Sequence, residues 1–98
     1  MVLELAILNV IQGREADFER AFREARSIIA STSGFVSLDL QKCLEQPNRY
    51  VLLVQWAKLE DHTVGFRQSP EYQRWKALLH HFYDPFPQVE HYAKVDAT

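Results

Sequence analysis

The chain has few of the residues on which many small proteins build a site. Cys43 is its only cysteine, so it can form neither an intrachain disulfide nor a metal site made of cysteines alone. Its three glycines, Gly13, Gly34 and Gly65, are too few and too scattered for a glycine-rich nucleotide-binding loop. One free thiol fits a reducing compartment, and we expect a cytoplasmic protein.

Charge of one sign and long apolar runs are also lacking. The net charge is -2, and acidic side chains offset the basic ones along the chain. Without a basic stripe interleaved with aromatics, we expect no nucleic-acid partner. No apolar run approaches the ~20 residues that span a bilayer. The N-terminal run carries Glu4 and lacks the basic start of a signal peptide, so we expect no membrane association.

The sequence does contain the strand pattern of one small domain, which we expect over residues 1–98. Val2–Ile11 and Tyr50–Ala57 are apolar in both alternating sets, as central strands are. Phe35–Leu44 alternates between apolar and polar residues, which predicts an edge strand, and Val89–Val95 predicts a last one. The apolar set of the edge strand is Val36, Leu38, Leu40 and Leu44.

Three helices are predicted between these strands. Apolar residues at 3.6-residue spacing predict a long amphipathic helix after Gly13, with Gly34 as its C-terminal stop. Helical periodicity returns in the second half. There the Ser69–Pro70 pair separates a short helix, Leu59–Arg67, from a second one, Pro70–Phe82.

The order of elements is strand, helix, strand, strand, helices, strand, which predicts an α+β fold. A ferredoxin-like βαββαβ antiparallel sheet in the order 4-1-3-2 places the two doubly apolar strands in its centre. Helices can cover only one face of such a sheet. Because the other face is also apolar, we expect a homodimer that forms through the open sheet face.

Chemically versatile side chains concentrate between Trp56 and Tyr92, which contains all four histidines and both tryptophans. His62 is the first candidate for acid–base work, because imidazole titrates near neutral pH. The adjacent pair His80 and His81 would point about 100° apart on a helix and cannot chelate as an i, i+4 pair would. Neither that pair nor His91 belongs to a metal-binding motif, so we expect no metal.

Four segments together resemble the antibiotic biosynthesis monooxygenase (ABM) family of dimeric α+β barrel proteins. They are G-R-E-A-D-F-E-R-A-F from Gly13, S-G-F-V-S-L-D-L from Ser33, Y-V-L-L-V-Q-W from Tyr50 and E-D-H-T-V-G-F-R-Q-S-P-E-Y-Q-R-W from Glu60. The resemblance covers nearly the whole chain. It implies small dimers with a pocket between the sheet and the helices of the second half.

Some members of that family are cofactor-independent monooxygenases of phenols or quinols, and others cleave haem. In the polyketide-oxidising members, the pocket has a tryptophan at the end of the third strand, where this chain has Trp56. Their asparagine, tyrosine and arginine correspond to Leu52, His62 and Lys76. The three residues of the haem-degrading members correspond to Ala6, Phe66 and Lys76, and none is kept.

The resemblance and the residues together predict an oxygenase of a small aromatic, quinol or polyketide-like substrate that needs no cofactor. His62 would transfer protons. The residues predicted to contact substrate are Trp56, Phe66, Arg67, Tyr72, Trp75 and Lys76. Two alternatives stay open: a non-catalytic or stress-related dimer that binds a small hydrophobic ligand, and a lyase or isomerase of the same fold. Tyr83–Pro87 is either a gate or a rigid connector.

Overall fold

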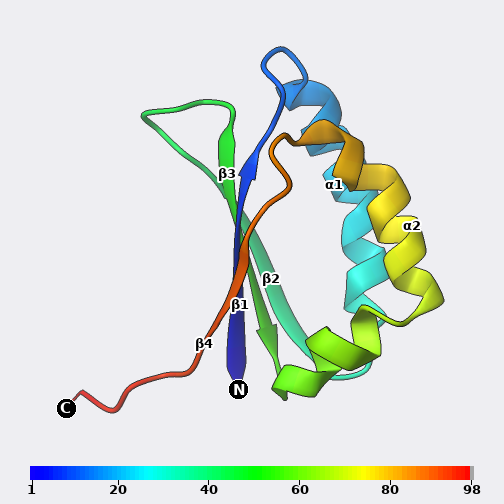
Figure 1. Cartoon of the computed structure of the whole chain (residues 1–98), viewed down its shortest axis with the longest axis vertical. Helices are drawn as coiled ribbons and strands as arrows, with labels where there is room; N and C mark the ends of the chain where they lie inside the picture. The colour runs from blue at the N-terminus through cyan, green and yellow to red at the C-terminus, as the bar shows by residue number, and fades with distance from the viewer. Residues whose placement is uncertain (98) are drawn as a thin grey trace.

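Two helices pack side by side on one face of a four-stranded antiparallel sheet in the computed structural model (Figure 1). The structure describes residues 1–97, so Thr98, the last residue of the predicted domain, lies outside it. The strands are β1 (Val2–Asn9), β2 (Phe35–Lys42), β3 (Arg49–Trp56) and β4 (Val89–Tyr92), in the order β2-β3-β1-β4. This is the order 4-1-3-2 counted from the other edge, so the predicted ferredoxin-like topology is confirmed.

The helical segments follow the predicted plan with shorter boundaries. Helix α1 spans Glu15–Ala30, the π-helical turn η1 spans Asp61–Phe66, α2 spans Pro70–Leu79, and the 3₁₀ turn η2 spans His80–Phe82. The backbone N–H of Tyr72 donates to Oγ of Ser69 at 3.1 Å, which caps the start of α2. Among residues 1–97, no helix is long and apolar enough to cross a membrane.

The core lies between the helices and one face of the sheet. Every second residue of β1 and β3 is buried there, as strand alternation requires. Helix α1 supplies its buried stripe at positions three or four residues apart. That stripe is Phe18, Phe22, Ala25 and Ile29.

No element of the described chain covers the other face of the sheet (Figure 1). In the β1–β3 register, Leu5 lies opposite Leu53 and Ile7 lies opposite Val51. Ile7 keeps 38% of its surface exposed. The predicted open apolar face is therefore present at the centre of the sheet.

Strand β2 departs from its predicted alternation. The register shifts between Phe35 and Ser37, which is the mark of a β-bulge, and Val36 is left 48% exposed. Phe35 instead packs its ring edge-on against Trp56, with centroids 6.0 Å apart. The strand ends at Lys42, so Leu44 is 91% exposed in the following turn. The prediction that Val36 and Leu44 share one face of the strand with Leu38 and Leu40 was wrong.

Gly34 fixes the approach of η1 to the sheet. Helix α1 already ends at Ala30, so Gly34 lies in the turn that follows and is not the helix stop that we predicted. Its φ of +85° is one that glycine adopts freely. A Cβ here would collide with the side chain of Asp61, and the Gly34 carbonyl accepts the backbone N–H of Ala57 at 2.8 Å. The close approach sets where η1 begins.

The two glycines with positive φ form a matched pair for a stability test. Gly34→Ala should destabilise the fold by about 1–2 kcal/mol through backbone strain and by about 1–3 kcal/mol more through overpacking against Asp61. Gly13→Ala should show only the strain, because φ is +91° there and no atom lies within 4 Å of the added Cβ. Urea unfolding of both variants measures the difference, and equal losses would contradict this view of Gly34.

Candidate active site

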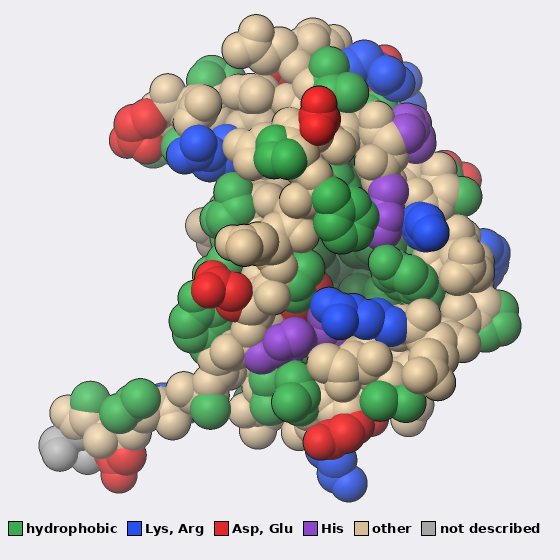
Figure 2. Space-filling view, viewed as in Figure 1, with side chains coloured by type: hydrophobic (Ala, Val, Ile, Leu, Met, Phe, Trp, Pro, Cys, Tyr) green, Lys and Arg blue, Asp and Glu red, His purple; other side chains and the backbone are tan. Residues whose placement is uncertain are grey.

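A cavity of about 410 Å³ opens between the sheet and the helices of the second half. It appears in Figure 2 as a hollow with histidine and basic side chains at its edge. Its size falls within the range typical of small-molecule sites. Most of its wall is apolar or aromatic: Ala6, Leu8, Ile29, Leu52, Phe66, Tyr72, Trp75, Phe86, Pro87 and Val89.

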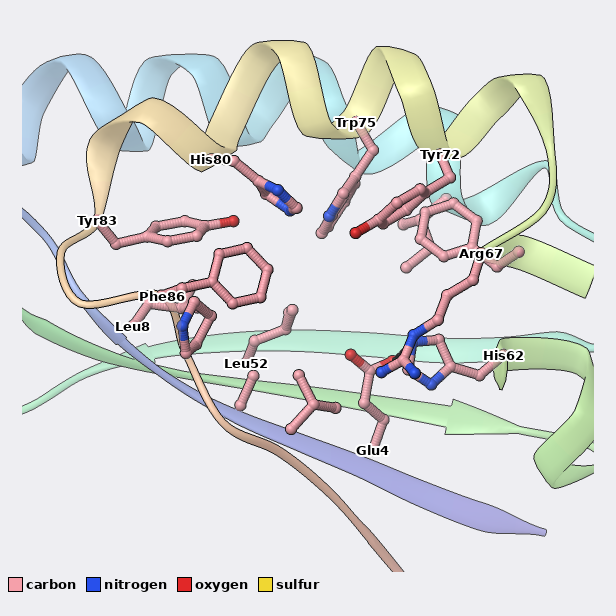
Figure 3. Close-up of a pocket in the computed structure, with 15 residues that line it drawn as sticks. Glu4, Leu8, Leu52, His62, Arg67, Tyr72, Trp75, His80, Tyr83 and Phe86 are labelled. Atoms are coloured by element: carbon pink, nitrogen blue, oxygen red, sulfur yellow. Dashed lines mark ion pairs between the residues drawn. The ribbon is translucent and has the colours of Figure 1, made fainter. Parts of the chain in front are cut away.

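Polar side chains gather at the two ends of this cavity (Figure 3). Glu4, His62 and Arg67 lie at one end, and His80 and Tyr83 lie at the other. A flat ligand between them would have apolar walls along its length and hydrogen-bonding groups at its ends. This arrangement is typical of sites that orient a small aromatic molecule.

Glu4 is a buried carboxylate on β1, with 5% of its surface exposed. The indole Nε1–H of Trp56 donates to its Oε1 at 2.9 Å. Burial raises the pKa of Glu4 above its usual value, while the Trp56 hydrogen bond and the charge of Arg67 act in the opposite direction. Glu4 therefore combines the properties expected of a general base: burial, a fixed position and an elevated pKa.

His62 is buried beside Glu4, with 4% of its surface exposed. Its Nε2 lies 3.4 Å from Oε1 of Glu4, and its Nδ1 lies 2.8 Å from Nε2 of His91. The ring stacks on Trp56 with centroids 5.4 Å apart. Burial, followed by the charges of Arg67 and His91, lowers the pKa of His62 to about 3. His62 is therefore a neutral imidazole at neutral pH.

Strand register brings these groups together. Glu4 lies directly opposite His91 on β4 and opposite Val54 on β3, and Trp56 follows Val54 on the same face. All of these side chains point to the helix-covered side of the sheet. The π-helical turn η1 then places His62 over them, and such turns recur at functional sites.

Arg67 follows η1 directly, and its guanidinium lies over the Glu4 end of the cavity (Figure 3). Glu60 and Glu71 are the acids near this residue in the sequence that could form a surface ion pair with it. Within residues 1–97, no carboxylate lies within ion-pairing distance of Arg67, although its charge lowers the pKa of both His62 and His91. The guanidinium is thus available to an anion in the cavity.

His80 lines the opposite end of the cavity. Its Nδ1 is buried and has no hydrogen-bond partner in the described chain. Burial, followed by the charge of Lys76, lowers the pKa of His80, and burial raises the pKa of Tyr83 beside it. Buried polar atoms are rarely left without a partner, so this nitrogen is an exception within the described chain.

Five of the seven predicted site residues line the cavity together: His62, Phe66, Arg67, Tyr72 and Trp75. Trp56 does not reach the wall, because it is fully buried behind Glu4 and His62. Lys76 lies on the exposed side of α2, because each helical residue is rotated about 100° from the one before it and Trp75 faces inward. The structure gives Lys76 no contact with the cavity.

Glu4 is the functional candidate that sequence reasoning missed. The signal was present, since a single acid interrupts a strand that is otherwise apolar on both sides. The sequence also gave no reason to place a carboxylate beside His62.

Among the described residues, no three metal-binding side chains are grouped to hold an ion. The two ring nitrogens of His62 contact partners on opposite edges, so those partners cannot converge on one metal.

Comparison with known proteins identifies the family of this chain. The sequence profile of the antibiotic biosynthesis monooxygenase family, ABM, matches residues 1–78. The chain belongs to this family. It is 55% identical, over 97% of its length and all of the relative's, to the uncharacterized protein YczJ of Bacillus subtilis.

Two crystal structures illustrate the range of the ABM family's fold. A Bordetella bronchiseptica protein that carries the family's name superposes with a TM-score of 0.92 at 38% identity, covering 96% of both chains. SnoaB, a cofactor-independent oxygenase from Streptomyces nogalater, superposes with a TM-score of 0.80 at 20% identity, covering 98% of this chain and 94% of its own. The second likeness establishes the shared fold alone.

The depressed pKa of His62 predicts how stability depends on pH. Between its unfolded value of 6.5 and about 3, the unfolded chain binds the proton that the folded protein excludes. The free energy of unfolding should therefore fall as the pH falls through this window, by up to about 1.4 kcal/mol per pH unit from His62. Glu4 contributes the opposite slope above 4.5, because its pKa is raised.

Comparison of the wild type with His62→Gln isolates the contribution of His62 to the pH dependence of stability, because Glu4 is present in both proteins. Urea unfolding between about pH 7 and about pH 5 should show a shallower acid-side loss of stability in the variant than in the wild type. His81→Gln, at an exposed histidine outside the cavity, is the control. Parallel curves for wild type and His62→Gln would show that His62 is not held neutral by burial.

Proposed function

We propose that this protein is a cofactor-independent monooxygenase of a small aromatic, quinol or polyketide-like substrate. The observation that carries the proposal is the buried pair of Glu4 and His62, whose nearest side-chain atoms lie 3.4 Å apart at the end of an apolar cavity. Membership of the ABM family supports the reaction class. The fold shared with SnoaB, itself a cofactor-independent oxygenase, supports it further.

The chemistry requires little from the protein beyond proton transfer and positioning. Loss of a proton from a phenol or an activated methylene gives an electron-rich anion, which reduces oxygen directly. For a methylene substrate the overall reaction is R₂CH₂ + O₂ → R₂C=O + H₂O. One oxygen atom enters the carbonyl, the other leaves as water, and the substrate supplies all the electrons. The apolar walls would keep bulk water from the anion.

Two groups in the cavity fit an oxygenated aromatic substrate. The guanidinium of Arg67 would stabilise the anion formed at the Glu4 end, since a charge developing in an apolar site is stabilised strongly by a fixed cation. At the far end, the hydroxyl of Tyr83, which points toward the cavity in Figure 3, would meet a second oxygen. A quinol, with oxygens at both ends of a flat ring, fits the pair of Arg67 and Tyr83.

Oxygen uptake on a panel of quinols and anthrone-type phenols tests the activity. His62→Ala should lower turnover by about 10²-fold or more, because the substitution removes one member of the buried pair that would take the proton from the substrate. His81→Ala, at an exposed histidine outside the cavity, should retain wild-type turnover. Unchanged turnover in His62→Ala would remove this residue from the mechanism.

The alternative of a non-catalytic binding dimer would use the same cavity. Its mostly apolar lining favours a hydrophobic ligand whether or not a reaction follows. Saturable binding of the same quinols by the wild type, without any oxygen uptake, would select this alternative over the oxygenase.

We also propose that two copies pair through the open sheet face. The apolar centre of that face would be buried by an identical face across a two-fold axis. Leu53→Lys places a charge there and should convert the dimer to monomers in light scattering. Gln12→Lys adds the same charge in an exposed turn and should leave the dimer intact. A Leu53→Lys protein that stays dimeric would exclude this face as the interface.

A further inference from the structure

Glu4, His62 and His91 form a linked series that reaches from the cavity to the outer strand. Glu4 is on β1, His62 is on η1 and His91 is on β4. His62 contacts Glu4 through Nε2 at 3.4 Å and His91 through Nδ1 at 2.8 Å. The geometry points to Glu4, rather than His62, as the group that accepts the substrate's proton. Within this assignment, which rests on the proposed function, His62 and His91 are positioning residues.

The hydrogen bond from Trp56 and the contact with His62 both use the same oxygen of Glu4 and leave the other for a ligand. Trp56 and His62 both contact Oε1, at 2.9 Å and 3.4 Å. Neither uses Oε2, and the carboxylate lies at the cavity in Figure 3. Glu4 is also the only acid among the described residues that line this cavity. A substrate hydroxyl can therefore reach Oε2 while Oε1 stays held by the protein.

His62 is poorly suited to be the acceptor itself. The ring is stacked on Trp56 and nearly sealed from solvent, and both of its nitrogens already face a partner. When Nδ1 accepts the Nε2–H of His91, the proton of His62 must be on Nε2, which then points at Oε1 of Glu4. In this tautomer His62 offers no free lone pair to a substrate. Its Nε2–H would then face the Glu4 carboxylate at 3.4 Å and stabilise the negative charge electrostatically.

Proton transfer from the substrate to Glu4 begins the reaction. The O–H bond of the substrate breaks, its electron pair stays on the substrate oxygen, and the proton forms an O–H bond with Oε2 of Glu4. The charge of Arg67 compensates the new anion. Once the substrate anion has reduced oxygen, Glu4 returns its proton to the oxygen atom that leaves as water. The second hydrogen of that water comes from the remaining C–H bond, whose electron pair forms the carbonyl as the O–O bond breaks. The other titratable groups that face Glu4 are His62, His91 and Tyr83, and none gains or loses a proton overall.

Glu4→Gln is the direct test, because it keeps the shape of the side chain and an oxygen that Trp56 can contact. With phenols that are protonated at the assay pH, kcat should fall by about 10²–10⁴-fold with KM little changed. With more acidic phenols, which enter already ionised, the loss should shrink. A uniform loss across the series, or wild-type kcat, would overturn the assignment.

Two substitutions at His62 separate a base from a positioning donor. The amide of His62→Gln can still donate to Oε1, whereas His62→Leu cannot. If Glu4 is the acceptor, Gln should retain several-fold more activity than Leu and shift the acid limb of the pH profile. Equal inactivity of both, together with an active Glu4→Gln, would identify His62 as the acceptor instead.

A measurement without substrate keeps this inference separate from the proposed function. Nitrogen NMR at neutral pH should find His62 protonated on Nε2, and His91→Phe should disturb that preference. Carboxyl carbon NMR should find Glu4 titrating above 4.5, and higher still in Trp56→Phe. Even if no phenol is oxidised, these spectra test whether His62 presents its Nε2–H to Glu4. A proton fixed on Nδ1 of His62 would contradict the proposed arrangement of Glu4, His62 and His91.

Discussion

A carboxylate that leaves water must find its hydrogen bonds inside the protein, and the site of this molecule is arranged around that requirement at Glu4. An unpartnered buried charge costs far more than a domain of this size can spare. Trp56 donates to Oε1 from the neighbouring strand, and His62 approaches the same oxygen from η1. The stacking of His62 on Trp56 joins these two partners into one rigid support.

The support depends on backbone features some distance from the carboxylate. Gly34 lets the turn before β2 pass close to Asp61, which is the first residue of η1. The π-helical winding of η1 then buries both His62 and Phe66 against the sheet. A change in the turn would therefore displace the imidazole without touching the cavity. Residues of this kind act on function through geometry alone.

The two ends of the cavity divide the work of recognition. At one end, Glu4 and Arg67 lie side by side, and in the proposed reaction they would act as proton acceptor and cation toward a hydroxyl that ionises. At the other, His80 and Tyr83 line the cavity. The aromatic wall between them suits a flat ring.

Sequence alone determined the topology, because the doubly apolar strands, the amphipathic helix and Pro70 each follow from local periodicity and backbone chemistry. The sequence also identified His62 as a candidate site residue. It predicted Phe66, Tyr72 and Trp75 as part of the cavity wall, since helical spacing shows which side chains share a face. Only the tertiary structure decided that Lys76 faces outward, that Val36 is expelled by a bulge, and that Trp56 lies behind the site. It alone revealed the group formed by Glu4, His62 and His91, three residues far apart in the chain. These three residues come into contact because of the strand register and the position of η1 on the sheet. Both are set by long-range pairing that no local pattern encodes.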